Sequence, residues 1–212
     1  MTARPSSPHV RHAVLICLVV VTLAACTNGD GGPGRDADRD GGGTATGSTS
    51  PTVTADGATF SGNGVTFTYP QDWHESTVTD ASVSAGQELW AETVGIDDVN
   101  FAWIAGYRID VPVTAEGIEQ QARAIGADFG SLFAQAGGEL TDGPEVVTLA
   151  GLPAVRLVGT AVTPAGATIE SRVVLAFDGR TEYFVNCQYN EDGEAEIVEG
   201  CELIVSTFDV SG

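Results

Sequence analysis

The residues of this chain that could do chemistry are 29 acids, four cysteines and three histidines, and there is no lysine. Without lysine, the chain cannot form a Schiff base, attach pyridoxal phosphate or supply the lysine of a P-loop. A serine-histidine-aspartate arrangement would have to use His74, because His9 and His12 fall in a segment with the features of a removed signal. There is no Gly-x-Ser-x-Gly elbow, and His74 directly follows Trp73, which we expect in the core. We therefore predict no catalytic residue and a protein that is not an enzyme.

The acids leave one catalytic alternative open. From Gly57 onward there are 24 aspartates and glutamates, so a pair of carboxyl groups for glycoside cleavage could form. A hydrolase of this kind would need that pair, or His74, inside a cleft. A single histidine and a paired set of cysteines serve zinc poorly. We expect neither a metal nor another cofactor.

Export is indicated by the N-terminal residues. Arg4 and Arg11 precede an apolar run from Ala13 to Ala25, which Cys26 follows. The run has about a dozen strongly apolar residues, fewer than the roughly 20 that a membrane span needs, and this anatomy is typical of a secretory signal. Its end, Leu-Ala-Ala-Cys, resembles the lipobox of bacterial lipoproteins, in which the cysteine is lipid-modified. The resemblance implies a signal peptide at residues 1–25, lipid on Cys26 and anchoring on the extracytoplasmic face of the cell membrane. An uncleaved span and a signal cut without lipidation are the alternatives.

Two cysteines remain after the anchor. Cys187 and Cys201 follow Cys26 in the chain, whereas Cys17 would leave with the signal. Two thiols in an exported chain should pair, so we predict a Cys187–Cys201 disulfide that joins a strand to the C-terminal helix. The alternative is a reactive thiol at Cys187.

A spacing like that of a calcium-binding EF-hand loop lies near the C-terminus. Its positions 1, 3, 5, 6, 9 and 12 hold Gln188, Asn190, Asp192, Gly193, Glu196 and Glu199. The first ligand should be aspartate but is glutamine. Ile197, moreover, fits the apolar face of a C-terminal helix, for which Asn190 or Asp192 is placed to be the N-cap. We predict no metal site, with calcium binding between Asn190 and Glu199 as the open alternative.

Charge excludes one class of partner. The formal net charge is −20, and from Gly57 onward 24 acids face five arginines. Such a field repels phosphate backbones and anionic headgroups. We therefore predict no binding to nucleic acid, and contact with the membrane only through the lipid on Cys26.

The chain divides into a tether and one domain. Residues 26–56 are mainly glycine, threonine, aspartate, serine and proline, a composition that cannot offset its own ordering entropy. Asp36, Asp38 and Asp40 alternate there, and a flexible acidic spacer explains them better than a metal loop does. Residues 57–212 have the length of a single globular domain.

Alternating apolar residues predict short strands separated by turns. We expect them at Ala58–Ser61, Val65–Tyr69, Leu89–Val94, Phe101–Ile109, Glu145–Leu149, Ala154–Val162, Thr168–Phe177 and Arg180–Tyr189. The last two would be antiparallel neighbours joined at Asp178-Gly179. Trp90, Trp103 and Tyr107 could line a binding site, although aromatic residues in strands are more often part of the core.

A period of 3.6 residues predicts two helices. The face of the first holds Ile118, Ala122, Ile125, Phe129, Leu132, Phe133 and Ala136, and that of the second holds Ile197, Cys201, Ile204 and Phe208. Thr114 is placed to cap the first helix and Gly137-Gly138 to end it. Gly126 and Gly130 inside it either allow close approach to the sheet or weaken the helix. The order of elements predicts an α+β fold: an antiparallel β-sheet of about six to seven strands covered by two helices.

Both ends of the domain resemble a known family. Residues 65–73, Val-Thr-Phe-Thr-Tyr-Pro-Gln-Asp-Trp, are similar to the opening of the small actinobacterial LpqN-type lipoproteins and, more distantly, of the PsbP-like extrinsic proteins of photosystems. The C-terminal end of the domain is similar too, with a tyrosine-rich strand, Cys187, and a helix that contains Cys201. The resemblance spans Phe60 to Phe208 and implies a PsbP-like sandwich used in binding or assembly. It transfers no catalytic residue, since the matching positions look architectural.

These observations favour a non-catalytic, lipid-anchored accessory protein of the cell envelope that binds or assembles with an envelope protein. A second hypothesis is a carrier or sensor of an apolar envelope ligand held between the first helix and the sheet, with Gly126 and Gly130 leaving room. A hydrolase is the third and weakest hypothesis.

Overall fold

The computed structural model describes residues 52–54, 57–76 and 86–211. The strands are β1 (Thr52–Thr54), β2 (Gly57–Gly62), β3 (Val65–Tyr69), β4 (His74–Glu75), β5 (Gln87–Gly95), β6 (Phe101–Val113), β7 (Leu140–Leu149), β8 (Leu152–Val162), β9 (Thr168–Tyr189) and β10 (Asp209–Val210). The helices are α1 (Ile118–Gln135) and α2 (Glu194–Thr207).

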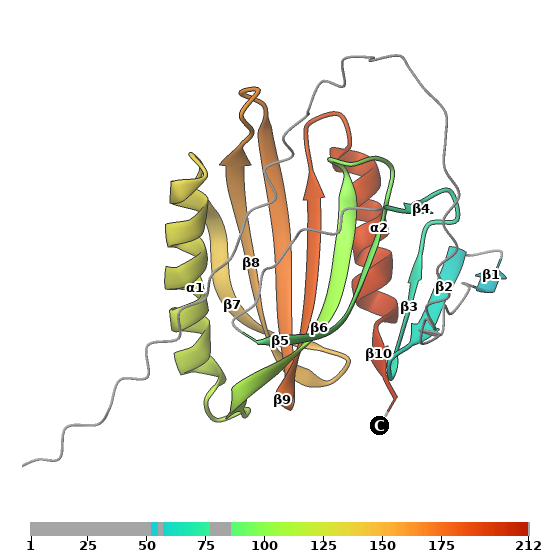
Figure 1. Cartoon of the computed structure of the whole chain (residues 1–212). Helices are drawn as coiled ribbons and strands as arrows, with labels where there is room; N and C mark the ends of the chain where they lie inside the picture. The colour runs from blue at the N-terminus through green and yellow to red at the C-terminus, as the bar shows by residue number, and fades with distance from the viewer. Residues whose placement is uncertain (1–51, 55–56, 77–85, 212) are drawn as a thin grey trace, which may run out of the picture.

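These strands form two antiparallel sheets (Figure 1). The large sheet has the order β4-β5-β6-β9-β8-β7, which roughly fits the expected strand number, and the small sheet has the order β1-β2-β3-β10. The α+β class is therefore confirmed. The β2–β3 hairpin, however, lies outside the large sheet: β2 pairs with β1, and β3 pairs with β10. A hairpin pattern predicts that two strands pair, but not which strand takes the remaining edge.

The long strand β9 is itself a hairpin. Arg172 Nε lies 2.7 Å from the Tyr189 hydroxyl, 17 residues further on. In one straight strand those residues would be about 56 Å apart. The chain reverses at Asp178 and Gly179, where Gly179 has a φ of +58°. The first arm pairs with β8 and the second with β6, so the turn predicted at this point is present.

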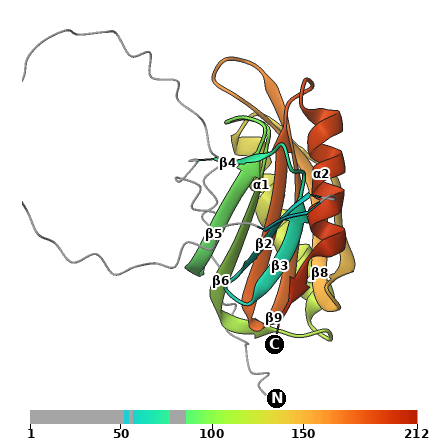
Figure 2. The ribbon, with the colours of Figure 1, turned by 90° about the vertical axis from the view of Figure 1, so that its right-hand side faces the viewer.

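The large sheet buries a different core on each face, because side chains alternate along a strand. On what we call the α1 face, Trp103, Tyr107 and Phe184 join a core with residues of α1. On the opposite side, the α2 face, Tyr183 and Val185 join a core with α2 and the small sheet. Figure 2 shows α2 at one side of the molecule and β5 at the other, with β6 and β9 between them.

Helix α1 packs against β7 and β8 at one edge of the large sheet (Figure 1). The approach is close: a Cβ on Gly126 would lie 2.6 Å from Pro144 Cγ, and one on Gly159 would lie 2.1 Å from the Phe133 ring. Gly126 thus serves close approach, and the idea that it leaves room for a ligand is wrong. A Cβ on Gly130 would meet nothing within 4 Å. Two helices are present, but the main contacts of α1 are with β7 and β8 at one edge of the large sheet and not across its whole face.

The predicted N-caps differ from those in the structure. Helix α1 begins at Ile118 after Gly117, and Thr114 instead closes the preceding turn, accepting a 3.0 Å hydrogen bond from the Gly117 N–H at its carbonyl. The N-cap of α2 is Gly193, with Asn190 Oδ1 accepting the Gly193 N–H at 3.1 Å. In both cases a tight turn precedes the helix, so the polar residue sits three positions before the N-cap. Phe208 follows α2 in an extended conformation and is not part of it.

A disulfide and a buried indole ring are among the contacts that hold α2 in place. Cys187 of β9 and Cys201 of α2 form a disulfide with a Cα–Cα distance of 6.1 Å. The Trp73 ring, only 4% exposed, lies against the helix at Gly200, where an added Cβ would be 2.2 Å from Trp73 Cζ2. Glycine is therefore required at this position of the helix because it lets the indole ring reach the backbone.

Strand β1 corrects the predicted tether. Thr52–Thr54 pair antiparallel with β2, inside the segment 26–56 that we expected to be unstructured. Threonine and valine favour strands because their branched side chains fit a pleated surface. The rest of the predicted signal and tether, Cys26 included, lies outside the described residues. Neither helix in the described part of the chain has the length and hydropathy to cross a membrane.

Candidate functional site

His74 is exposed on β4, where it pairs with Gly95. Its charge is one of the smaller influences on the neighbouring acid Asp97. Burial would raise the pKa of Asp97, but hydrogen bonds from the Asn100 side chain and from the N–H groups of Val99 and Asn100 outweigh it and lower the pKa. Asp97 is therefore occupied in holding its own turn.

The residues at both ends of the EF-hand-like spacing belong to β9 or to α2. Helix α2 begins at Glu194, so Glu194–Glu199 are helical and cannot wrap around an ion as an EF-hand loop does. The Gln188 side chain donates to the Val99 carbonyl at 3.2 Å. Within residues 52–54, 57–76 and 86–211, no three histidine, cysteine or acidic side chains gather as metal ligands would.

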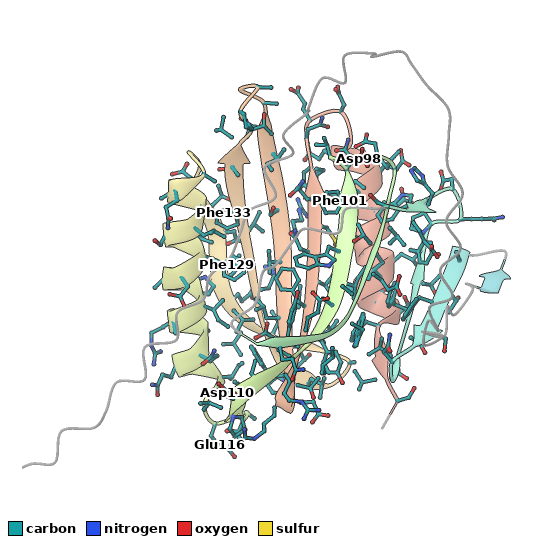
Figure 3. The ribbon with its side chains drawn as sticks, in the orientation of Figure 1. Asp98, Phe101, Asp110, Glu116, Phe129 and Phe133 are labelled. Atoms are coloured by element: carbon teal, nitrogen blue, oxygen red, sulfur yellow. A yellow bond between two sulfur atoms is a disulfide. The ribbon has the colours of Figure 1, made fainter. Side chains whose placement is uncertain are left out.

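The three aromatic residues singled out from the sequence lie on both faces of the large sheet. Trp90 packs on the α2 face, where its ring stacks on Phe60 at 6.2 Å. Trp103 and Tyr107 are buried on the α1 face. They share that face with Phe101, also on β6, and with Phe129 and Phe133 of α1 (Figure 3). The three residues therefore do not line one site.

A polar row crosses the α1 face at Tyr107. Glu88 on β5 and Glu182 on β9 each stand opposite Tyr107 in the strand register. Asn186 follows Glu182 by four residues, and both alternate with Tyr183 and Val185, which face the other core. Tyr107 Oη and Asn186 Oδ1 are buried without a hydrogen-bond partner. We call Glu88, Tyr107 and Glu182 the polar row. Together with Asn186, further along β9, these residues are the candidate site.

Electrostatics set this row apart. Burial of its carboxyl group raises the pKa of Glu182 to about 7, although part of the residue's surface is exposed. Burial, followed by the charges of Glu88 and Glu182, raises the pKa of the Tyr107 hydroxyl above its ordinary value. An acid in this state lacks a cationic partner, because such a partner would lower its pKa.

The raised pKa of Glu182 makes stability depend on pH. The unfolded chain releases this proton near pH 4.5 and the folded chain near pH 7, so stability should fall as pH rises through this window. This difference in pKa corresponds to roughly 3 kcal/mol of folding free energy, and the partial exposure of Glu182 reduces that value. We expect Glu182→Gln to be about 1 to 3 kcal/mol more stable than the natural chain at pH 8, and close to it at pH 4.5. Urea unfolding of the full chain in mild detergent at both pH values measures this.

Glu88→Gln is the matched control, because Glu88 stands in the same row but is exposed. Its unfolding curve should show the same pH dependence as the natural chain. A Glu182→Gln effect of equal size at both pH values would mean that titration of this carboxyl group does not cause the difference.

On the α2 face, the hydroxyl of the buried Tyr189 has hydrogen-bond partners. The Tyr189 hydroxyl accepts from Arg172 Nε at 2.7 Å and donates to Glu170, and Arg172 lies 3.4 Å from Glu170. Burial, and the hydrogen bond with Glu170, raise the pKa of Tyr189 to about 12. Every polar group of this triad has a partner, whereas the hydroxyl of Tyr107 has none.

Sequence reasoning named Tyr107 but missed Glu182 and Asn186. The signal was present: both alternate with apolar residues in a strand, and polar residues inside a strand with two buried faces are unusual. What was not available was the register, which places Glu182 beside Tyr107, 75 residues earlier in the chain.

Comparison with known proteins shows similarity of fold only. No family model and no curated protein matches the sequence. Similar solved structures include the cyanobacterial PsbP protein (CyanoP) of Synechocystis, with 18% identity and a TM-score of 0.54 over 78% of this chain and 98% of that one. A protein of Bacteroides thetaiotaomicron has 14% identity and a TM-score of 0.48 over 74% of this chain. This chain spans about half (49%) of the length of that protein. LpqN of Mycobacterium tuberculosis, described as involved in cell envelope biogenesis, has 13% identity and a TM-score of 0.46 over 77% of this chain and 90% of that one.

The similarity to CyanoP supports a PsbP-like fold for this chain, as the resemblance at the ends of the domain implied. At 18% identity it carries no statement about activity. Membership of an LpqN-type family stays a prediction from the sequence.

Proposed function

We propose that this protein is a lipid-anchored, extracytoplasmic accessory protein of the cell envelope that acts by binding and not by catalysis. The lipobox-like motif ending at Cys26 supports the anchor and the location. The acidic domain supports a role away from nucleic acid and anionic membrane surfaces. The PsbP-like fold is compatible with a role in assembly or binding.

The observation that carries the proposal is the pair of buried polar atoms without partners, Tyr107 Oη and Asn186 Oδ1. Leaving such atoms unpaired destabilises a folded chain by about 1 to 3 kcal/mol each. Another molecule that supplies hydrogen bonds on this face would remove the penalty. Because these two atoms lack hydrogen-bond partners, we propose binding rather than catalysis.

The principal partner that we propose is an envelope protein, with the tether giving the domain its reach from the membrane. Cross-linking in intact cells, followed by purification of the full chain through a C-terminal tag, should recover one reproducible partner. Native mass spectrometry of the chain purified from its own membranes then distinguishes a protein complex from a chain that carries one small molecule. Lipidated chain without any companion, in both experiments, would contradict the binding function.

A small envelope ligand is the second candidate, because the unpartnered atoms lie on one face of the sheet. The position first expected for it, between α1 and the strands beneath it, is occupied by Phe133 against Gly159 and by Pro144 against Gly126.

Replacing Cys26 with serine tests the anchor. Two acyl chains hold a lipoprotein stably on a bilayer, and without them the acidic domain has no affinity for anionic lipid. We expect Cys26→Ser to move most of the protein from the membrane fraction to the soluble fraction, as measured by fractionation and immunoblotting. Cys17→Ser is the control and should remain in the membrane fraction. Residues 1–25 still attached to the natural chain in the membrane fraction, as measured by intact mass, would instead indicate an uncleaved span.

A further inference from the structure

Most of the outer side of β5 has no neighbouring strand in the described part of the chain. In the large sheet β5 lies between β6 and the two-residue strand β4. β4 pairs with β5 only at Val94 and Gly95, whereas β5 begins at Gln87. Figure 2 shows β5 at one side of the molecule. We call the outer side of residues 87–93 the β5 edge. An uncovered strand edge presents backbone N–H and C=O groups that can pair with another chain.

One hydrogen bond shows which backbone groups point outward from the β5 edge. The Thr93 carbonyl accepts the Ser76 N–H at 2.9 Å, on the side of β4 and away from β6. Backbone groups of alternate residues point to the same side of a strand, so those of Ala91 point outward as well. Ala91 is exposed, and it pairs with no residue of β4. Its N–H and carbonyl are therefore placed to bond to an additional strand.

The other outer strands are less suited to such pairing. β7, at the opposite edge of the large sheet, contains Pro144, which has no N–H, and its pairing with β8 shifts register twice. In the small sheet the outer strands are β1 and β10, which have three and two residues. Proline, irregular pairing and short strands are features that keep sheet edges from associating. β5 has nine residues, no proline and one bulge, at Leu89.

The side chains beside the β5 edge are acidic on one face and small or apolar on the other. Glu92 alternates with the α2-face residues of β5, and its charge interacts with that of Glu75 on β4. Burial, followed by the charge of Glu75, raises the pKa of Glu92, as expected for an acid without a cationic partner. Ala91 points to the α1 face, and the neighbouring Leu89 is 44% exposed. Neither β4 nor β5 contains an arginine.

We propose that the β5 edge binds an extended segment of the envelope partner in which basic and apolar residues alternate. The segment adds as a strand that pairs with the N–H and carbonyl of Ala91. Its lysine or arginine side chains lie beside Glu92 and Glu75 on the α2 face, and its apolar side chains lie beside Ala91 on the α1 face. This inference rests on the proposed function, binding to an envelope protein, and gives it a surface and a partner chemistry.

A second copy of this chain is a poorer occupant. Pairing of two β5 edges would bring the same acids, Glu92 and Glu75, of both copies together, and like charges on neighbouring strands are destabilising. The full chain in mild detergent should therefore sediment as a monomer at neutral pH. A stable dimer that Ala91→Pro abolishes would overturn the proposal, because the edge would then serve self-association.

Calorimetric titration with heptapeptides of blocked ends tests the chemistry of the partner. The first peptide alternates lysine and valine, and the second has glutamate in place of each lysine. With the full chain in mild non-ionic detergent at neutral pH and about 0.15 M salt, the lysine peptide should bind at least tenfold more tightly than the glutamate peptide. Equal binding of the two, or no binding of the lysine peptide, would overturn the proposal.

Backbone methylation separates strand addition from simple attraction between opposite charges. A valine opposite Ala91 would direct its N–H toward β5, whereas the lysines would direct theirs to solvent. N-methylation of two valines should therefore weaken binding tenfold or more, and N-methylation of the two inner lysines should weaken it much less. Both methylated peptides keep the charge of the lysine peptide. Equal binding of the two would show that no strand is added and would overturn the proposal.

Amide hydrogen exchange, followed by nuclear magnetic resonance, tests whether the β5 edge is open. In the free chain the Ala91 N–H should exchange rapidly, whereas the Glu92 N–H, which points to β6, should be protected. The lysine peptide should slow exchange at Ala91 tenfold or more and leave Glu92 unchanged. An Ala91 N–H that is already protected in the free chain would overturn the proposal, because the edge would then be covered.

Substitutions locate the binding surface. Ala91→Pro removes the outward N–H but no hydrogen bond to β6, so the variant should fold and should bind the lysine peptide at least tenfold more weakly. Glu92→Gln and Glu75→Gln should each weaken binding severalfold, and the loss should shrink at high salt. Glu139→Gln is the matched control, because Glu139 is an exposed acid next to β7 at the opposite edge of the sheet. Unchanged binding in both Ala91→Pro and Glu92→Gln would place the peptide elsewhere and overturn the proposal.

The result separates this inference from the general function. If the lysine peptide fails these tests while cross-linking in cells still recovers a reproducible partner, the β5 edge is not the binding surface and only the inference fails. A recovered partner that the Ala91→Pro chain no longer captures would support both. If cross-linking recovers no partner and the peptide does not bind, both fail.

Discussion

Replacing Trp73 with alanine should lower the free energy of unfolding by about 3 to 4 kcal/mol. The indole ring is 4% exposed and lies, together with Pro70, against the backbone of α2 at Gly200. Truncation to alanine leaves a cavity beneath the helix, which surrounding residues cannot fill. The loss should fall at the lower end of the usual range, because the buried Trp73 Nε1 has no hydrogen-bond partner and its removal recovers part of the energy. Urea unfolding followed by circular dichroism measures the change.

A double-mutant cycle shows whether Trp73 and Gly200 act as a pair. In the natural chain, Gly200→Ala should destabilise by about 1 to 2 kcal/mol, because overpacking against the ring outweighs the helix propensity of alanine. In the Trp73→Ala background this penalty should shrink by at least about 1 kcal/mol. Gly130→Ala, in α1, is the control: no atom lies within 4 Å of the added Cβ, so it should stabilise. Strictly additive effects at Trp73 and Gly200 would contradict the packing described here.

Removing the disulfide with Cys187→Ala and Cys201→Ala together should lower the free energy of unfolding by about 3 kcal/mol. The bond closes a loop between residues separated by 14 positions and joins α2 to β9. In the chain-entropy model, the loss comes mainly from greater freedom of the unfolded chain. The unfolding midpoint in urea, compared with that of the natural chain, gives the effect.

Reduction of the natural chain is the matching experiment for the double variant. Treatment with a phosphine reductant should lower the midpoint by a similar amount, and should not alter the double variant. Thiol labelling of the unreduced, unfolded protein should find no free thiol. Two labelled equivalents would show that the cysteines are not paired in the cell and would restore the hypothesis of a reactive Cys187.

Local structure could be predicted well from the sequence where neighbouring residues decide it. The apolar alternation and turns of β2, β3 and β9, and the 3.6-residue period of α1 and α2, indicated those elements. Helix starts were missed, because Gly117 and Gly193 follow tight turns whose hydrogen bonds involve Thr114 and Asn190. A polar residue before an apolar run has the same appearance whether it caps a helix or a turn.

Packing decided which readings of the glycines were correct. A glycine inside a helix indicates either close approach or weakness, and the sequence cannot distinguish them. Pro144 against Gly126 and Trp73 against Gly200 show close approach at these two positions. Each partner lies far from its glycine in the sequence, and no local pattern connects the two.

The sequence by itself determined the acidic balance, the absence of lysine chemistry and the pair of cysteines available for a bond, and it carries the prediction of export. These depend on which residues are present and on short-range spacing. Tertiary structure alone decided the site. Glu88, Tyr107 and Glu182 lie in one row only because β5, β6 and β9 are neighbours in the large sheet and pair in one register. A shift of one residue would turn Glu182 to the opposite face, and that register is set by long-range pairing and packing of the whole sheet.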